Sequence, residues 1–185
     1  AEILVWGFDT QFANYKTGYI KTLGVSVVRL TEVLNNVGDV NTFNSLEGTL
    51  FINTAALFND LTHRRIIISD GTANNYILLS YFTSSNRIQA VIFNGAANQA
   101  VLNYTPADTT IFSKIAVTWK VNDFSLWVDG EERASDVSGT VSSAGTFNEL
   151  SFENGAGGNN FYGRNRDLRV YKTALNDADL EDITT

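Results

Sequence analysis

The stretch KIAVTWKVNDFSLWVDGEE, residues 114–132, predicts a β-hairpin and contains two of the chain's three tryptophans. Its two halves alternate apolar and polar side chains on either side of Asn122–Asp123. A two-residue Asn/Asp connection favours a tight turn because both residues tolerate positive φ. With Val121 opposite Phe124, one face reads Ile115, Val117, Trp119, Val121, Phe124, Leu126 and Val128, and the other reads Ala116, Thr118, Lys120, Ser125, Trp127 and Asp129.

The two tryptophans of this hairpin face opposite ways. The pairing sets Trp119 opposite Leu126 and Thr118 opposite Trp127, and side chains alternate between the two faces of a strand. Trp119 therefore belongs to an apolar core. Trp127 stands on a polar face, where we expect it to be at least partly exposed and to require a functional explanation.

The rest of the chain has the sequence pattern of an all-β protein. Nine short alternating runs are separated by Gly, Asn, Ser and Asp clusters at the spacing typical of sandwiches; they cover residues 48–55, 64–69, 75–82, 87–93, 99–104, 114–121, 124–130, 149–154 and 166–171. A helix is predicted over 176–183, with Asn176 as its N-cap, and a short helical turn over 54–61. We therefore predict a sandwich of two antiparallel sheets with a short C-terminal helix.

Composition limits the classes of function. The 185 residues and 44% hydrophobic content suit one domain with a full core. The chain has no cysteine, which excludes disulfides and thiolate metal sites. Its net charge is −7 and it lacks a Lys/Arg stripe, which argues against nucleic acid and anionic membranes. No apolar run approaches the roughly 20 residues that a membrane helix requires.

Four segments carry a family resemblance: EGTLFIN (47–53), IIISDGTANNYILL (66–79), the hairpin 114–132 and RDLRVYKTALNDADLEDIT (166–184). In kind and order they resemble the strands and final helix of a laminin-G-like (pentraxin/LamG type) domain of the concanavalin A-like lectin/glucanase superfamily, as found in phage and prophage tail proteins. The resemblance implies a jelly-roll sandwich.

The N-terminal region suggests an arm, which divides the chain into an arm and linker, 1–45, and a sandwich, 46–185. Residues 5–33 resemble a segment that precedes the sandwich in tail proteins, although Lys21 and Val28 stand where those proteins usually have proline and threonine. The apolar run 2–8 would be an exposed edge unless it is covered. It can complete a sheet in a neighbouring virion subunit, and the resemblance implies a homo-oligomer, a trimer. Alternatively it folds back onto the same domain.

Three residues are candidates for sugar binding. Trp127 on its polar face can stack on a pyranose ring, and Tyr81 and Arg87 flank the turn of another predicted hairpin. The alternative is that Trp127 is covered by a loop or by another subunit.

Members of this fold often hold calcium at a loop edge, and Asp70, Asn74 and Asn75 offer oxygen ligands for it. A second loop offers Glu153, Asn154 and Asn159. Asp-Gly and Asn-Gly are also ordinary turn sequences, and neither loop has EF-hand spacing, so we favour the turn interpretation. No other cofactor is indicated.

Catalysis has the least support, and we predict no catalytic residues. Glucanases of this superfamily carry alternating acids on one strand, whereas here Glu149 and Glu153 flank Leu-Ser-Phe without a central acid. Such a pair could serve glycoside hydrolysis, but we expect both to face solvent. His63 is the chain's one histidine and lies between Thr62 and Arg64 in a predicted loop.

The sequence therefore predicts a non-enzymatic module of a phage tail fibre or related virion protein, with a host-surface glycan as its candidate ligand. The alternative is a carbohydrate-binding module of a secreted polysaccharide-active enzyme. The expected location is the virion in the first case and outside the cell in the second.

Overall fold

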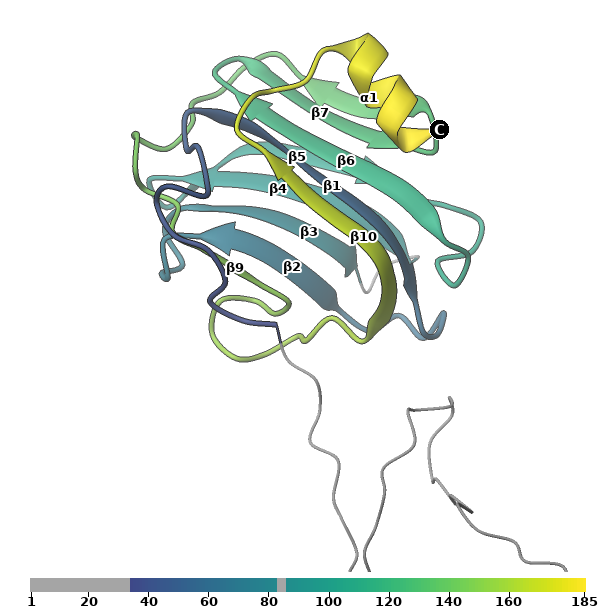
Figure 1. The fold of residues 1–185 in the computed structure, drawn as a ribbon. Coiled ribbons are helices and arrows are strands. Elements are labelled where there is room, and N and C mark those ends of the chain that lie inside the picture. The colour runs from purple at the N-terminus through teal and green to yellow at the C-terminus, as the bar shows by residue number, and fades with distance from the viewer. Residues whose placement is uncertain (1–33, 83–85) are drawn as a thin grey trace, which may run out of the picture. The chain divides into compact units, whose positions relative to one another are not determined.

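The computed structural model describes residues 34–82 and 86–185, which fold into a sandwich of two antiparallel sheets (Figure 1). The first sheet has the order β10-β1-β6-β7-β8 and the second the order β5-β4-β3-β2-β9. The elements are β1 Glu47–Ala56, β2 Arg64–Ser69, β3 Tyr76–Phe82, β4 Arg87–Asn94, β5 Ala97–Tyr104, β6 Ser113–Lys120, β7 Asp123–Val128, β8 Glu131–Asp136, β9 Glu149–Ser151, β10 Gly163–Tyr171 and α1 Asp177–Thr184. The predicted fold class is confirmed.

The core lies between the two sheets. Alternate residues of the strands supply it, and Trp119, Phe124 and Phe147 are its largest fully buried side chains. Trp119 meets Phe147 edge-on with ring centroids 6.4 Å apart, and its indole nitrogen donates to the carbonyl of Asn44 at 3.1 Å. The prediction that Trp119 is a core residue is confirmed.

The β6–β7 hairpin exists, but its register differs from the prediction. Trp119 lies opposite Phe124, and the connection consists of Val121 and Asn122. Asn122 takes the positive φ, at 58°. The predicted partner of Trp119 was Leu126, two positions further along β7. A shift of two positions leaves every paired side chain on its predicted face, although Val121 becomes an exposed turn residue.

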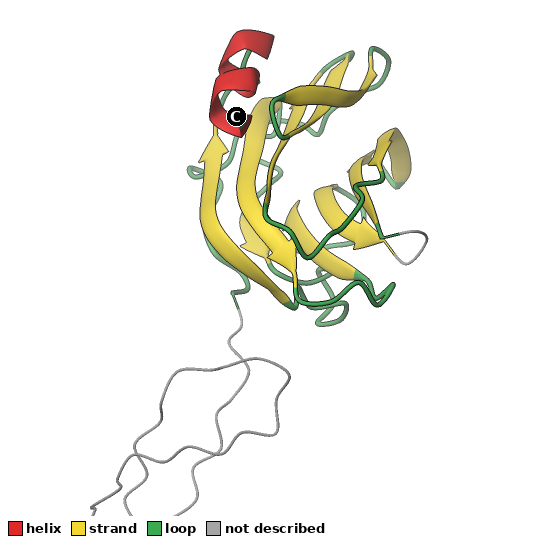
Figure 2. Cartoon of the chain, turned by 90° about the vertical axis from the view of Figure 1, so that its right-hand side faces the viewer, coloured by secondary structure: helices red, strands yellow, loops and turns green. Residues whose placement is uncertain are grey.

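Trp127 is only 7% exposed, so the expectation of an exposed indole is wrong. It forms a cluster with Ala116 and Leu180, against which Leu175 and Ile183 also pack. Helix α1 contacts β6, β7 and β8 and covers this outer part of the first sheet (Figure 2). The helix itself is confirmed, including the cap: the side chain of Asn176 accepts from the backbone N–H of Asp179 at 3.0 Å.

Two further expectations differ from the structure. Strand β8 was not predicted, because its sequence EERASD is polar and lacks apolar alternation. Residues 54–56 end strand β1, and 57–61 form no helical turn, so the helical prediction for 54–61 is wrong. Register pairing of β1 with both β6 and β10 holds this segment extended. Within the described residues, no helix is long and apolar enough to cross a bilayer.

Residues 34–45, which the sequence analysis placed in the linker, pack against the sandwich. Val37 and Leu150 exchange backbone hydrogen bonds of 3.0 and 2.8 Å, and Phe43 is buried in the main core. Residues 1–33 of the predicted arm lie outside the described residues, so the assembly role of the arm stays a prediction.

Gly48 provides a test of the packing around Trp119. A Cβ at position 48 would overlap the buried indole ring of Trp119, which is held by its hydrogen bond to Asn44. Gly48→Ala should therefore lower the free energy of unfolding by about 1–3 kcal/mol, as overpacked cores do. Adding Trp119→Phe removes the overlapping ring, so the two changes should be less harmful together than their sum. Additive losses in urea unfolding would contradict this packing.

Leu180→Ala tests whether α1 shields Trp127. The side chain of Leu180 is 1% exposed and packs on the indole, so truncation should cost about 2–5 kcal/mol and raise acrylamide quenching of tryptophan fluorescence. Glu181→Ala, at an exposed position of the same helix, serves as the control and should change neither quantity. Equal melting temperatures for the two variants would show that the helix is not a structural cover.

Candidate ligand-binding site

The structure does not bring the three predicted sugar-binding residues together. Trp127 lies beneath α1 on the first sheet, and Tyr81 is 4% exposed and points into the main core. Arg87 lies on the opposite face of the second sheet, because Phe82 rather than Tyr81 is its register partner. Neither buried ring offers a flat surface to a sugar, and only Arg87 lies on an accessible face.

The predicted calcium residues form a hydrogen-bonded turn. Asp70 accepts from the backbone and hydroxyl of Thr72 at 2.8 and 2.6 Å, and from the side-chain amide of Asn75 at 2.7 Å. The side-chain Oδ1 of Asn75 accepts from the backbone N–H of Gly95 at 3.0 Å. Asn74 is exposed. These contacts are those of a turn, and within the described chain no group of three or more His, Cys, Asp or Glu side chains is arranged to hold a metal ion.

The two glutamates near β9 differ in their surroundings. Glu149 is partly buried and accepts a hydrogen bond from the Ser69 hydroxyl at 3.2 Å. Glu153 is only 5% exposed, so the expectation that it faces solvent is wrong. The glycine-rich loop that follows folds back beside it, and a Cβ at Gly157 would lie 3.7 Å from the Glu153 carboxylate.

The second sheet has one face toward the core and one face away from it. The face that points away from the core is here called the outer face. Its residues follow from strand register and lie in rows across β2, β3 and β4. The central row is apolar and consists of Ile67, Leu78 and Val91, which form a cluster separate from the main core. On one side of this row Tyr76 and Phe93 stack with ring centroids 4.7 Å apart.

The other side of the apolar row is polar. Register sets Arg65 opposite Ser80, and Ser80 opposite Gln89. The next row pairs Phe82 with Arg87, whose guanidinium lies 4.8 Å from the Phe82 ring centroid. His63 meets the same ring edge-on at 4.6 Å. Burial and, to a smaller extent, the charge of Arg65 lower the pKa of His63, so its imidazole is neutral at neutral pH.

Unpartnered polar atoms concentrate on this outer face. Among the described residues, eight buried side-chain nitrogen or oxygen atoms have no hydrogen-bond partner. Five of the eight belong to this face or its margin: His63 Nδ1, Arg65 Nε, Ser80 Oγ, Arg87 Nε and Glu153 Oε2. Buried polar groups are normally hydrogen-bonded because an unmade bond costs about 1–3 kcal/mol. Because five of these atoms share one face, the outer face is the candidate ligand-binding surface of the described chain.

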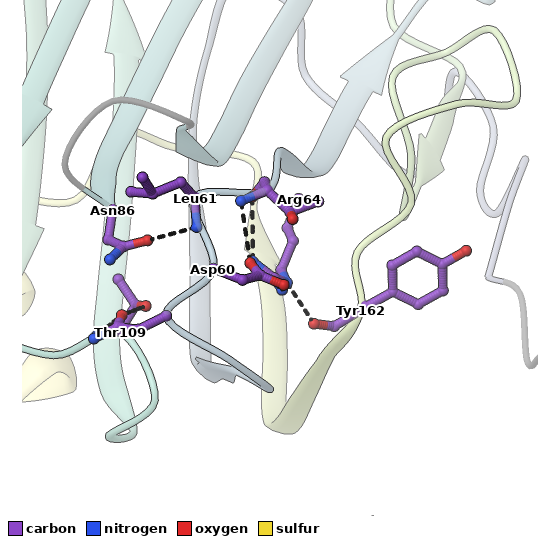
Figure 3. Close-up of polar contacts among 8 residues, drawn as sticks. Asp60, Leu61, Arg64, Asn86, Thr109 and Tyr162 are labelled. Carbon is purple, nitrogen blue, oxygen red and sulfur yellow. Dashed lines mark hydrogen bonds and ion pairs between the residues drawn. The ribbon is translucent and has the colours of Figure 1, made fainter. Parts of the chain in front are cut away.

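Arg64 shows what a structural arginine looks like in the same strand. Its guanidinium donates to the carbonyls of Tyr162 and Thr62 at 2.9 and 3.2 Å and to both carboxylate oxygens of Asp60 at 2.8 and 2.9 Å (Figure 3). It is 3% exposed and ties the loop before β2 to the segment before β10. Arg65, its neighbour on the other face, has no such set of acceptors.

The loop 153–160 forms one margin of the outer face. Asn154 Oδ1 accepts from the backbone N–H groups of Ala156 and Gly158, both at 3.0 Å, so the loop has an internal cap rather than a free tip. Its far end is tied to β2, because Arg65 N–H donates to the Asn159 carbonyl at 3.1 Å. A Cβ at Gly155 would lie 3.6 Å from the Ile67 side chain, so the loop reaches the apolar row.

Comparison with known proteins gives one family and many similar structures. The model of the family described as the concanavalin A-like lectin/glucanases superfamily matches residues 42–181. No curated protein sequence matches the chain. The CBM40 module of the Ruminococcus gnavus IT-sialidase superposes with a TM-score of 0.64 at 16% identity, covering 84% of this chain and 97% of that one.

Two further solved structures show the same fold. Domain 4 of a GH43 extracellular arabinanase from Geobacillus stearothermophilus, solved with arabinotriose, has a TM-score of 0.62 at 13% identity over 83% of this chain and 75% of its own. A heptameric SAP-like pentraxin from Limulus polyphemus has a TM-score of 0.63 at 9% identity over 82% of this chain and 74% of its own. At these identities the likeness concerns the fold alone.

The Asp70 turn makes a prediction about pH. Partial burial raises the pKa of Asp70, but hydrogen bonds from Asn75 and Thr72 outweigh it and hold the pKa below 3.8. The carboxylate therefore stabilises the fold above pH 3.8, and this stabilisation is lost as pH falls through the lower folded-state pKa. Asp70→Asn should be less stable than the native chain at pH 7, and the gap should narrow below pH 3.8 in urea unfolding.

A gap that is constant across pH would contradict this role of the Asp70 carboxylate. Thermal melting with and without added calcium tests the calcium hypothesis. A calcium-dependent rise in melting temperature that Asp70→Asn abolishes would show that the loop holds the ion.

Proposed function

Because the chain belongs to the concanavalin A-like lectin/glucanases superfamily, we propose that it is a non-catalytic carbohydrate-binding module of a secreted carbohydrate-active enzyme. Its binding site is the outer face of the second sheet. This is the alternative that the sequence left open beside the tail-fibre module. The observation that carries it is the concentration of unpartnered polar atoms on that face.

The chemistry of the outer face suits a sugar. A pyranose presents C–H surfaces and a rim of hydroxyl groups, so it needs apolar contact and hydrogen bonds side by side. The row of Ile67, Leu78 and Val91 supplies the apolar floor. Ser80, Arg65 and Arg87 supply donors next to it, and Glu153 supplies an acceptor at the β9 margin. Few convergent polar groups on an apolar surface are typical of ligand sites.

The similar structures support this proposal. The R. gnavus CBM40 module has been solved with α2,3- and α2,6-sialyllactose, and the arabinanase domain with arabinotriose. Both are parts of glycan-processing enzymes, which favours the same context for this chain over a virion. The tail-fibre interpretation rests on the resemblance to tail proteins, and the arm with its trimer rests on residues 1–33, which lie outside the described residues. Both stay predictions.

The carboxylates near β9 support a non-catalytic role. Glycosidases present two carboxyl groups to one glycosidic bond. Here Glu149 is engaged with Ser69, and Glu153, only 5% exposed beside the glycine-rich loop, has one buried oxygen without a hydrogen-bond partner. Neither is displayed together with the other on an open surface. Release of reducing ends from a polysaccharide, lost in Glu149→Gln, would overturn this part of the proposal.

Ser80→Ala tests the site with a variant that should fold well. The Ser80 hydroxyl is 2% exposed and has no partner, so its removal should leave the melting temperature unchanged or raise it. In calorimetric titration with the best binder from a glycan array, affinity should fall about 2- to 12-fold, the equivalent of one lost hydrogen bond.

Ser45→Ala is the matched control. Its hydroxyl is fully buried and accepts from Phe147 N–H at 2.9 Å, away from the outer face. This variant should lose stability and keep its affinity. An array without any bound glycan, or a Ser80→Ala variant with unchanged affinity, would contradict the proposed site.

A further inference from the structure

Arg65 and Arg87 flank Ser80 on the outer face. Arg65 lies directly opposite Ser80 on β2, and Arg87 lies diagonally across on β4, next to Gln89, the other partner of Ser80. Directly opposite Cβ atoms in a sheet are about 5 Å apart and diagonal ones about 7–8 Å. Both arginine side chains are long enough to reach the space above the Ser80 hydroxyl. The face therefore places two arginines within reach of one hydroxyl, although the Arg87 guanidinium lies over the Phe82 ring, 4.8 Å from its centroid.

Of the arginines that the structure describes, three have carboxylate counterions and four, including Arg65 and Arg87, do not. Arg64 pairs with Asp60, Arg133 with Glu131 and Arg169 with Asp167. Among the described residues, neither Arg65 nor Arg87 forms an ion pair with a carboxylate. Both are only partly exposed, and the Nε atom of each is buried without an acceptor. Removing a cation from water without a partner is unfavourable, so an anion would complete this arrangement.

The lack of partners is unexpected in so acidic a protein. The chain carries 20 Asp and Glu against 13 Lys and Arg, so carboxylates are abundant. A general attraction of anions to its surface is disfavoured by the net charge of −7. An anionic ligand would need a specific local site, and the Arg65/Arg87 pair is such a site.

The unpartnered oxygen of Glu153 indicates which chemical groups a ligand of the outer face must carry. Its buried Oε2 atom at the β9 margin lacks a donor. A ligand that completes the whole face must therefore bring hydroxyl donors as well as an anionic group. A sulfate ion carries no hydroxyl group and would give Glu153 no donor. A sugar that carries a carboxylate offers both kinds of group.

We propose that the outer face binds a carboxylate-bearing sugar, with the carboxylate held between Arg65 and Arg87 above Ser80 and a ring hydroxyl donating to Glu153. This inference rests on the proposed function and names its ligand class. The planar fork of arginine matches a carboxylate with two parallel hydrogen bonds. Sialic acids and uronic acids share this chemistry, and the test below separates them.

The ligand reaches these groups by displacing flexible side chains. Register surrounds Ser80 with Arg65 and Gln89 on the neighbouring strands and with Leu78 and Phe82 along its own. Arg65 and Gln89 have long side chains that swing aside without movement of the backbone. The Nε atom of Arg65 and the Ser80 hydroxyl, which lack partners among the described residues, then pair with the ligand, whereas the Gln89 amide donates to Asn103 Oδ1 at 2.9 Å.

The experiment uses matched pairs of glycans that differ in the carboxylate: 3′-sialyllactose with lactose, and an oligogalacturonate with its carboxyl-reduced form. Calorimetric titration of the native chain should favour the acidic member of one pair at least about tenfold, as expected for charge-assisted hydrogen bonds. The pair that shows this preference identifies the source of the carboxylate. Sulfated lactose should not replace sialyllactose.

Arg65→Gln and Arg87→Gln should each reduce the preference for the acidic glycan to within about threefold, because each removes one charge-assisted contact. Arg65→Lys keeps the charge and loses the fork, so it should give an intermediate loss even if the glutamine variant folds poorly. Arg166→Gln is the matched control. This exposed arginine lies on β10 of the first sheet, 3.7 Å from the Phe112 ring centroid, and its removal should leave the preference intact.

The outcomes separate this inference from the proposed function. If neutral and acidic glycans bind equally and Ser80→Ala weakens both, glycan binding stands and the carboxylate inference fails. The inference also fails if the acidic preference survives in Arg65→Gln and Arg87→Gln, or if sulfated lactose binds better than sialyllactose. If no glycan binds at all, the proposed function fails, and the inference fails with it.

Discussion

The pairing register of β2, β3 and β4 is the constraint on which both the core and the candidate site depend. Because side chains alternate between faces, one register places Ile66, Leu79 and Ala90 in the core. The same register places Arg65, Ser80 and Gln89 in a row on the outer face. A slip of one residue would bury the arginine and expose the core. The hydrophobic core therefore also fixes the positions of the polar side chains of the candidate site.

The outer face is maintained at some cost in stability. Five buried polar atoms without partners oppose folding, and in a region of purely structural importance they would be expected to acquire partners, as Arg64 did. The tightly packed interior around Trp119 offsets this cost. The core packing and the candidate site thus lie on the two faces of a single sheet.

Much of the fold could be predicted from the sequence, because its signals are local. Alternation gave the nine predicted strands, and the Asn176 cap gave the helix. Strand β8 was missed since its residues are polar. Exposure of Trp127 was wrongly predicted because its cover, Leu180, lies 53 residues away in a helix whose docking site the sequence does not reveal. Local patterns do not show which face a distant segment covers.

The candidate site was harder to predict. Arg87 was identified from its place beside a turn, but Tyr81 was grouped with it although the observed pairing of Phe82 with Arg87 puts Tyr81 on the core face. Arg65 and Ser80 become a site only when three strands are set in register, and Glu153 only when the loop 153–160 folds back. The useful signal in the sequence was an arginine at an outward position near one end of each of the two strands that flank β3.

The position of α1 has a practical consequence for handling the protein. The helix and the terminal Thr185 lie against the first sheet beside the β7–β8 turn, where a Cβ at Gly130 would contact Thr185, whereas the outer face belongs to the second sheet (Figure 2). The two surfaces point in opposite directions. A sensor chip, bead or dye joined at the C-terminus therefore leaves the outer face open to solution. Attachment through residues near β3 or β4 would block the outer face.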